Sequence, residues 1–278
     1  MAAPTETKNL AMFCDFENIA IGAKEAKYAG FDIRKVIERL LLKGAIVVKK
    51  AYCDWDRYKE YKKTMHEASF ELIEIPHVRL SGKNSADVRL VVDALDLCYT
   101  KEHVDTFVVV SGDSDFSPLV SKLRENNKVV IGVGVKNSTS DLLIANCDEF
   151  IFYDDLVRRE EVEQRQRKKR PRRKAAPKGG KAAPGVKEEK DDDRVQRAMD
   201  LVIDTVEALM EERGEEEIIW GSMVKQAIKR RQPGFNESYY GFRTFSRVLE
   251  EAQSRGLLEI HLDDKSGGYI IKDVFFEE

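Results

Sequence analysis

Cysteine and histidine are scarce in this chain of 278 residues, which contains four of each. The cysteines Cys14, Cys53, Cys98 and Cys147 stand far apart and form no CxxC pair and no Cys/His cluster. This spacing argues against a zinc site and against a disulfide-dense secreted domain. The four histidines form no usable pattern, so candidate chemistry has to come from other side chains.

Long apolar runs are also lacking. The first ten residues, MAAPTETKNL, contain no apolar signal-peptide core, and no run approaches the roughly 20 residues that span a bilayer. We therefore expect a chain without a membrane segment, in a reducing compartment, and predict a cytoplasmic location.

Two further absences exclude specific phosphate-handling motifs. The segment GVGVKNS (132–138) follows a late strand and lacks the full GxGxxG pattern, so it is not read as a dinucleotide-binding loop. A phosphatase loop of the type DxDxT fails as well, because Asp15 is followed by Phe16, Glu17 and Asn18.

The apolar content of the chain, 42%, is enough for a core. Strand-like and helix-like segments alternate over residues 9–155. Apolar runs predict strands over 10–16, 45–53, 70–76, 106–111, 128–135 and 149–153. Helical spacing predicts helices over 32–44, 57–69, 85–99, 118–126 and 141–147. Such alternation predicts the α/β class, with a mainly parallel sheet covered by helices on both faces.

The composition changes after the alternating region, and a net charge of −3 hides this local asymmetry. Residues 158–193 begin with many cations, prolines and glycines and no apolar periodicity, which is typical of a disordered linker. Helices are then expected over 195–212, 220–233 and 238–256, and a β-hairpin over 257–262 and 269–274. We predict three parts: 8–156, the linker 157–193, and a small winged-helix domain, 194–278.

Carboxylates follow the strands of the predicted sheet. Asp15 ends the first strand, and Asp113 and Asp115 follow the fourth, in FVVVSGDSDF. Sites in open parallel sheets lie beyond the carboxyl ends of the strands, so these three meet if the two strands are neighbours. Asp87 is a fourth candidate, because it opens a partly apolar stripe of its helix. Asp93 is turned roughly 120° from Asp87 on an ideal helix and ranks lower.

Several carboxylates at one place repel each other unless a cation lies between them. Oxygen ligands without His or Cys select Mg²⁺ or Mn²⁺, which assist phosphodiester cleavage. Simpler interpretations remain open: Asp113 or Asp115 caps the following helix, and Asn18 shapes the turn after the first strand.

Four segments, FCDFENIA, GKNSADVRLVVDALD, VVVSGDSDFSPLVSKLRE and CDEFIFYDDL, occur in the order found in the NYN domain. Residues 8–156 resemble this family in its LabA-like (DUF88) branch, a relative of the PIN-type nucleases. The resemblance implies a Rossmann-like α/β/α sandwich that hydrolyses RNA with Mg²⁺ or Mn²⁺. It places the family's acidic positions on Asp15, Asp87, Asp113 and Asp115, with Asn18 and Asp93 as further matches.

The C-terminal part, with PGF before SYYGFRTF and a terminal hairpin, resembles the LOTUS (OST-HTH) domain over about 195–274. This resemblance implies binding of RNA, in some members G-rich or G-quadruplex RNA, and in others of a protein partner. Candidate RNA contacts there are cations and tyrosines, although packing of a small core is the stronger interpretation for the neighbouring Phe242 and Phe245. The candidates are Lys225, Lys229, Arg230, Arg231, Tyr239 and Tyr240.

Cations outside the two domains have alternative interpretations. Three interpretations of the linker cations are open: they contact RNA phosphates, they keep a tether extended, or they mimic a nuclear localisation signal. These cations include Arg170, Arg172 and Arg173. Lys83 meets a substrate phosphate or is an ordinary surface lysine. Two functions therefore compete: a metal-dependent ribonuclease, which all four carboxylates favour, and a non-catalytic RNA-binding adaptor.

Overall fold

The computed structural model describes residues 8–75, 85–158, 188–214 and 217–275. These residues form two compact units, one holding 8–158 and the other 188–275. No helix within the described ranges is long and apolar enough to cross a membrane.

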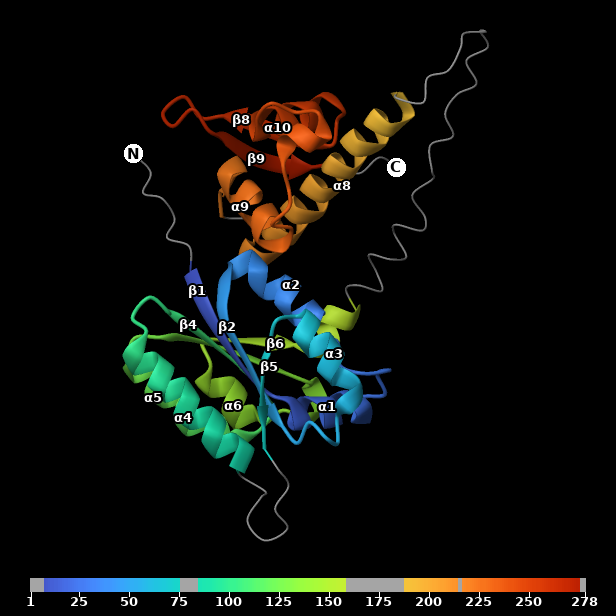
Figure 1. Ribbon diagram of the computed structural model, residues 1–278. Helices are drawn as coiled ribbons and strands as arrows, with labels where there is room; N and C mark the ends of the chain where they lie inside the picture. Colours follow the sequence, from blue (N-terminus) through green and yellow to red (C-terminus); the bar gives the residue numbers. More distant parts are fainter. Residues whose placement is uncertain (1–7, 76–84, 159–187, 215–216, 276–278) are drawn as a thin grey trace. The chain divides into compact units, whose positions relative to one another are not determined.

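The N-terminal unit is built on a six-stranded sheet in which every neighbouring pair of strands is parallel (Figure 1). Its order is β3-β2-β1-β4-β5-β6. The strands are β1 (Lys8–Asp15), β2 (Gly44–Cys53), β3 (Glu71–Glu74), β4 (Thr106–Val110), β5 (Val129–Gly134) and β6 (Glu149–Phe152). This sheet confirms the predicted α/β class with a mainly parallel sheet.

Helices cover both faces of this sheet (Figure 1). The helices α1, α2 and α3 contribute to the buried cluster on one face, and α4, α5 and α6 to the cluster on the other. Their bounds are α1 (Phe16–Glu25), α2 (Ile33–Lys43), α3 (Lys59–Glu67), α4 (Ser85–Thr100), α5 (Ser117–Glu125) and α6 (Asp141–Asn146). Short 3-10 turns, η2 (Ser114–Phe116) and η3 (Lys136–Ser138), precede α5 and α6.

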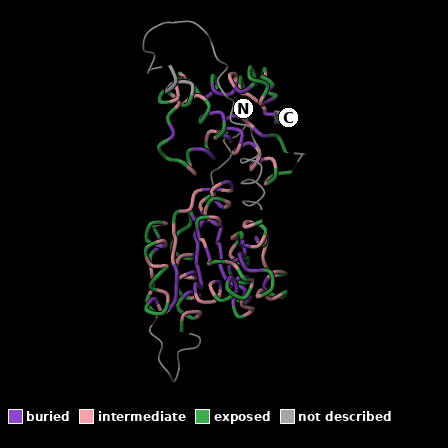
Figure 2. The backbone as a smooth tube through the Cα atoms, turned by 90° about the vertical axis from the view of Figure 1, so that its right-hand side faces the viewer, coloured by how far each residue is buried: buried purple, intermediate pink, exposed green. Residues whose placement is uncertain are grey.

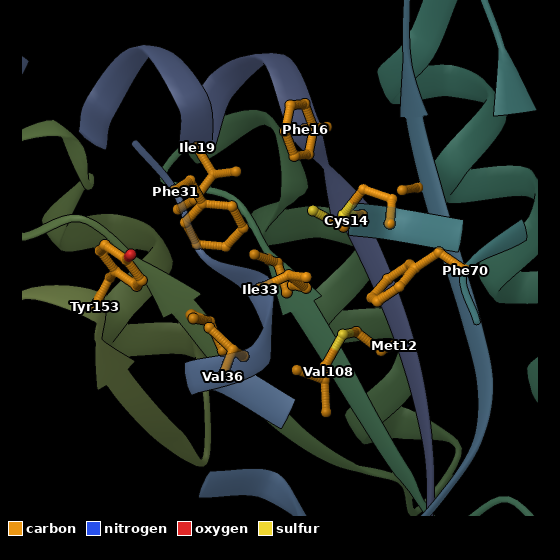
Figure 3. Close-up of a cluster of buried hydrophobic side chains, with 14 of the residues drawn as sticks. Met12, Cys14, Phe16, Ile19, Phe31, Ile33, Val36, Phe70, Val108 and Tyr153 are labelled. Atoms are coloured by element: carbon orange, nitrogen blue, oxygen red, sulfur yellow. The ribbon is translucent and has the colours of Figure 1, made fainter. Parts of the chain in front are cut away.

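The central strand β1 shows why its apolar run is continuous. Met12 and Cys14 belong to one buried cluster, drawn in Figure 3, whereas Ala11 and Phe13 belong to the other. Alternate side chains of a strand point to opposite faces, so a strand covered on both faces needs apolar residues at every position. Figure 2 shows the sheet strands as the buried interior of this unit.

The strand order positions the functional site. From β1 the chain adds β2 and then β3 on one side, and β4 afterwards pairs with the opposite edge of β1. The direction of sheet growth reverses between β1 and β4, and open α/β sheets bind ligands beyond the carboxyl ends of the strands at such a reversal.

The C-terminal unit combines helices with a three-stranded antiparallel sheet of order β7-β9-β8. The predicted hairpin is present as β8 and β9, and the two-residue strand β7 adds a third strand that the sequence did not predict. Its elements are α8 (Glu188–Arg213), β7 (Ile219–Trp220), α9 (Gly221–Arg231), η4 (Glu237–Tyr240), α10 (Phe245–Ser254), β8 (Leu258–Leu262) and β9 (Tyr269–Val274).

Two sequence-based helix boundaries need correction, and one helix was not predicted. The single helix predicted over 238–256 is wrong, because Gly241 adopts a left-handed φ of 87° and Thr244 caps a new helix. Helix α8 begins at Glu188 inside the predicted linker, since acidic residues stabilise a helix N-terminus. Helix α1 was not predicted. Asp15 caps this helix, and its side chains Phe16, Ile19 and Ala23 are buried.

Candidate active site

Two candidate carboxylates lie at the reversal point of the sheet. Strands β1 and β4 pair up to Cys14 and Val110; Asp15 is the last residue of β1, and Asp113 follows the end of β4 by three residues. Both side chains therefore emerge at the carboxyl ends of neighbouring strands.

Hydrogen bonds tie these two strand ends together. The Ser111 hydroxyl donates to Asp15 Oδ2 at 3.1 Å and accepts from the backbone N–H of Asp113 at 3.2 Å. The backbone N–H of Gly112 donates to Asn18 Oδ1 at 2.9 Å. Ser111 is fully buried, so this small network holds both aspartates in fixed positions.

Asp15 and Asp113 are also helix caps, a role that the simpler interpretation gave to Asp113 or Asp115 and not to Asp15. Asp15 Oδ1 accepts from the backbone N–H of Asn18 at 3.4 Å, and Asp113 Oδ1 accepts from that of Asp115 at 3.0 Å. Asp115 is not a cap; it lies exposed within η2. Capping uses one carboxylate oxygen of each residue. Both residues therefore cap a helix and also lie at the same edge of the sheet.

Asp15 is in an unfavourable environment for a charge. It is 6% exposed, and burial is the main reason that its pKa rises to about 7. The charges of Asp87 and Asp113 raise this pKa further, against the hydrogen bonds from Asn18 and Ser111 that lower it. A protonated and an ionised Asp15 are therefore both accessible near neutral pH.

Asp87 joins this group from the first turn of α4. Burial raises its pKa to about 6, with added repulsion from Asp113, Asp115 and Glu17. Four predicted carboxylates, from β1, α4 and the turn after β4, thus act on one another. Glu17 is a fifth, which sequence reasoning missed; it lies in the same FCDFEN segment and pairs with Arg57 at 3.0 Å.

The donor chemistry suits a hard cation, because every side chain of the group offers carboxylate oxygen. Burial is the main cause of the raised pKa of Asp15 and Asp87, and the mutual repulsion that adds to it is the effect that a bound cation would relieve. Across the described ranges, however, no three His, Cys, Asp or Glu side chains are arranged to hold a metal ion.

Asp93 lies outside this group. Burial raises its pKa, but the Tyr52 hydroxyl at 2.9 Å and Lys50 Nζ at 3.3 Å, together with Arg89, outweigh burial and lower it. Asp93 therefore carries a compensated charge in a separate cluster, which is the role of a structural ion pair.

The candidates of the C-terminal unit have mixed environments. Lys225 pairs with Glu237 at 2.7 Å, and Arg230 and Arg231 are half-buried, whereas Lys229 is exposed. Tyr239 is 55% exposed beneath Arg194 at 5.1 Å, and Tyr240 stacks on Phe235 at 5.3 Å. Four further candidates lie outside the described residues: Lys83, Arg170, Arg172 and Arg173.

Comparison with known proteins places the N-terminal unit. A 148-residue stretch is 26% identical to "Meiosis regulator and mRNA stability factor 1" of Xenopus tropicalis, covering 53% of this chain and 9% of that protein. The same factor from Bos taurus is 25% identical over 150 residues, which cover 53% of this chain and 8% of that protein. An uncharacterised protein of Methanocaldococcus jannaschii is 28% identical over 117 residues.

A solved structure of a Vibrio parahaemolyticus protein of unknown function covers 55% of this chain and 97% of its own, with 28% identity and a TM-score of 0.49. The profile of the NYN domain matches residues 9–154, more than half of the chain. The carboxylates described above all lie within this match. The chain therefore belongs to the NYN domain family.

Proposed function

We propose that the N-terminal unit is a metal-dependent ribonuclease of the LabA-like branch, which cuts RNA internally by phosphodiester hydrolysis. The observation that carries this proposal is the group of carboxylates at the reversal between β1 and β4, with the pKa of Asp15 near 7 and that of Asp87 near 6. Strongly perturbed carboxylates at the ligand-binding edge of a sheet are typical of catalytic sites.

In this proposal Asp15, Asp87, Asp113 and Asp115 hold Mg²⁺ or Mn²⁺. When bound, the cation supplies electrostatic stabilisation of the charge that develops on the phosphate. The protein itself orients the ligands: Ser111 fixes Asp15 through a hydrogen bond of 3.1 Å, and Asn18 fixes the turn at Gly112. Without the cation Asp15, with a pKa of about 7, is partly protonated at neutral pH, so binding of the cation releases this proton.

RNA is the proposed substrate for two reasons. The NYN family is related to PIN-type nucleases, and the names of two relatives include mRNA stability. We further propose that the C-terminal unit is a LOTUS-like module that brings RNA, including G-rich RNA, or a protein partner to the nuclease. Lys229 and Tyr239 support this, because both are exposed and a cation and an aromatic ring are side chains that contact RNA.

A non-catalytic RNA-binding adaptor is the second candidate. The observation that favours it is that no complete metal-ligand set is formed among the described residues. The two candidates differ in one measurable property, turnover of RNA in the presence of a divalent cation.

The deciding experiment incubates the purified chain with labelled single-stranded RNA in Mn²⁺, in Mg²⁺ or in EDTA. We expect cleavage with a divalent cation, none in EDTA, and a loss of at least about a hundredfold in the Asp113→Asn variant. Asp96→Asn is the matched control, because Asp96 is an exposed carboxylate further along α4. Cleavage that persists in EDTA, or in Asp113→Asn, would reject the metal-dependent ribonuclease.

A further inference from the structure

A pocket of about 620 Å³ opens beside the carboxylates. It lies between the η2–α5 segment and the first turn of α6, and these elements contact each other. Asp115 belongs to both the carboxylate group and the pocket wall. The lining residues are Ser114, Asp115, Ser117, Pro118, Ser121 and Leu142.

The apolar part of this wall consists of Pro118 and Leu142. Leu142 is 57% exposed although it sits in the first turn of a helix whose next residue, Leu143, is fully buried. An exposed leucine that lines a concavity offers a flat partner surface to a ring, as ligand pockets combine apolar walls with a few polar groups.

The polar part consists of three hydroxyls. Ser117 is only 7% exposed, and its hydroxyl has no hydrogen-bond partner among the described residues. The Ser121 hydroxyl donates to the Ser117 carbonyl oxygen at 3.1 Å, which leaves its lone pairs to accept. The Ser117 hydroxyl oxygen is shielded from solvent, so the hydroxyls that a ligand in this pocket reaches are those of Ser121, which is exposed, and of Ser114.

Charge decides which part of a nucleotide fits. Among the residues that line this pocket, the only ionisable side chain is the Asp115 carboxylate. A phosphate group next to the one at the carboxylates would therefore be repelled there. A nucleobase and its ribose are neutral, present a flat ring to Leu142 and Pro118, and offer a 2′-hydroxyl to the serines.

We propose that this pocket binds one nucleobase and the attached ribose of single-stranded RNA, beside the phosphate that the carboxylates address. The proposal rests on the ribonuclease function above and makes the pocket a subsite that holds RNA in register. It also gives the unit a means to distinguish RNA from DNA through Ser121.

The first test scans an abasic nucleotide along a short labelled single-stranded RNA. Binding to the full chain is followed by fluorescence anisotropy with Mg²⁺ in the Asp113→Asn background, which limits cleavage. We expect one position at which loss of the base weakens binding roughly three- to tenfold. That effect should vanish in Leu142→Ser and persist in Val92→Ser, a control whose side chain is 56% exposed on α4.

The second test replaces the ribose at the sensitive position by deoxyribose. Binding should weaken in the parent protein but not further in Ser121→Ala, because the hydroxyl partner is already absent. Ser121 is exposed, so Ser121→Ala should melt at nearly the temperature of the parent protein. A Ser121→Ala protein that still distinguishes ribose from deoxyribose at this position would show that Ser121 does not recognise the ribose.

The outcomes separate this proposal from the ribonuclease itself. Suppose that RNA is cleaved, but that removing a base weakens binding equally at all positions or still does so in Leu142→Ser. The pocket is then not a subsite, although the ribonuclease function is supported. If the Leu142-dependent base effect is present without cleavage, the subsite stands in a binding protein. Absence of any RNA binding overturns the subsite.

Discussion

Asp15 serves two functions that single residues rarely combine. One carboxylate oxygen caps α1, and the other accepts from Ser111 at the ligand-binding edge of the sheet. The cap contributes roughly 1 kcal/mol, whereas burying the charge beside Asp87 and Asp113 costs more. The ionised Asp15 therefore carries a net cost in stability in the metal-free protein, which is typical of a functional position.

The raised pKa of Asp15 predicts how stability depends on pH without metal. Between about pH 4 and pH 7 the folded protein binds more protons than the unfolded chain, so the free energy of unfolding falls as pH rises. The full penalty, at most about 4 kcal/mol, is present above pH 7. Melting temperatures in EDTA should therefore decrease from pH 5 to pH 8.

Asp15→Asn keeps a capping oxygen and removes the charge. This variant should flatten the pH dependence between pH 5 and 8 and melt at a higher temperature at pH 8, while Asp96→Asn should behave like the parent. Parallel pH profiles for Asp15→Asn and the parent protein would show that the charge of Asp15 is not what destabilises the fold.

At the scale of elements, the turn between β4 and η2 depends on close backbone contact. A Cβ at Gly112 would lie 2.2 Å from the carbonyl oxygen of Ser138 and 3.0 Å from Thr139 Cα. Because these are backbone atoms, no side-chain rotation relieves the contact. The close packing of this turn on the segment before α6 holds Ser111 and Asp113 in place.

Gly112→Ala should therefore lower stability by about 1–3 kcal/mol and reduce RNA cleavage in proportion to the displacement of Asp113. Gly234→Ala is the control, since nothing lies within 4 Å of a Cβ at that position. Thermal unfolding and the cleavage assay test both parts. A Gly112→Ala protein with the parent's melting temperature would contradict the backbone contact.

The break between η4 and α10 is another element-scale feature. Gly241 has a φ of 87°, a conformation that costs other residues roughly 1 kcal/mol. Gly241→Ala should destabilise the fragment 188–278 by about that amount, and Thr244→Ala by a similar amount through the lost cap. Trp220, the single tryptophan of that fragment, reports its denaturant unfolding. Unchanged midpoints in both variants would favour the continuous helix predicted from sequence.

At the scale of the whole molecule, the division into two compact units predicts a division of labour. Residues 1–158 should retain cleavage at higher RNA concentration, because the acidic site itself repels phosphate. Residues 188–278, starting where α8 begins, should bind RNA in a manner that persists as salt rises. Each phosphate contact by the cations between the units should add a slope of about −0.7 in log K against log salt.

These fragments are compared with the full chain by anisotropy across a salt series. RNA binding that is absent from 188–278 at every salt concentration, with full affinity in a peptide of residues 159–187, would make the C-terminal unit a protein-interaction module. Cleavage of RNA by residues 188–278 would contradict the assignment of the chemistry to the N-terminal unit.

The sequence by itself determined the local elements and the candidate carboxylates. Continuous apolar runs such as Phe107–Val110 specify buried strands wherever they pair, and the stripe through Ala94 and Cys98 specifies the buried face of α4. Family motifs then identified Asp15, Asp87, Asp113 and Asp115 as a group. The predictions of strands and helices succeed because they depend on residues close together in the chain.

Only the tertiary structure decided which of these groups meet. The pairing of β1 with β4 brings Asp15 near Asp113 across about 100 residues of chain, and Ser111 links them. Asp93, a family match, is removed from the group because Lys50 and Tyr52 of β2 pair with it. Strand order and long-range ion pairs reflect the packing of the whole unit, which no local pattern encodes.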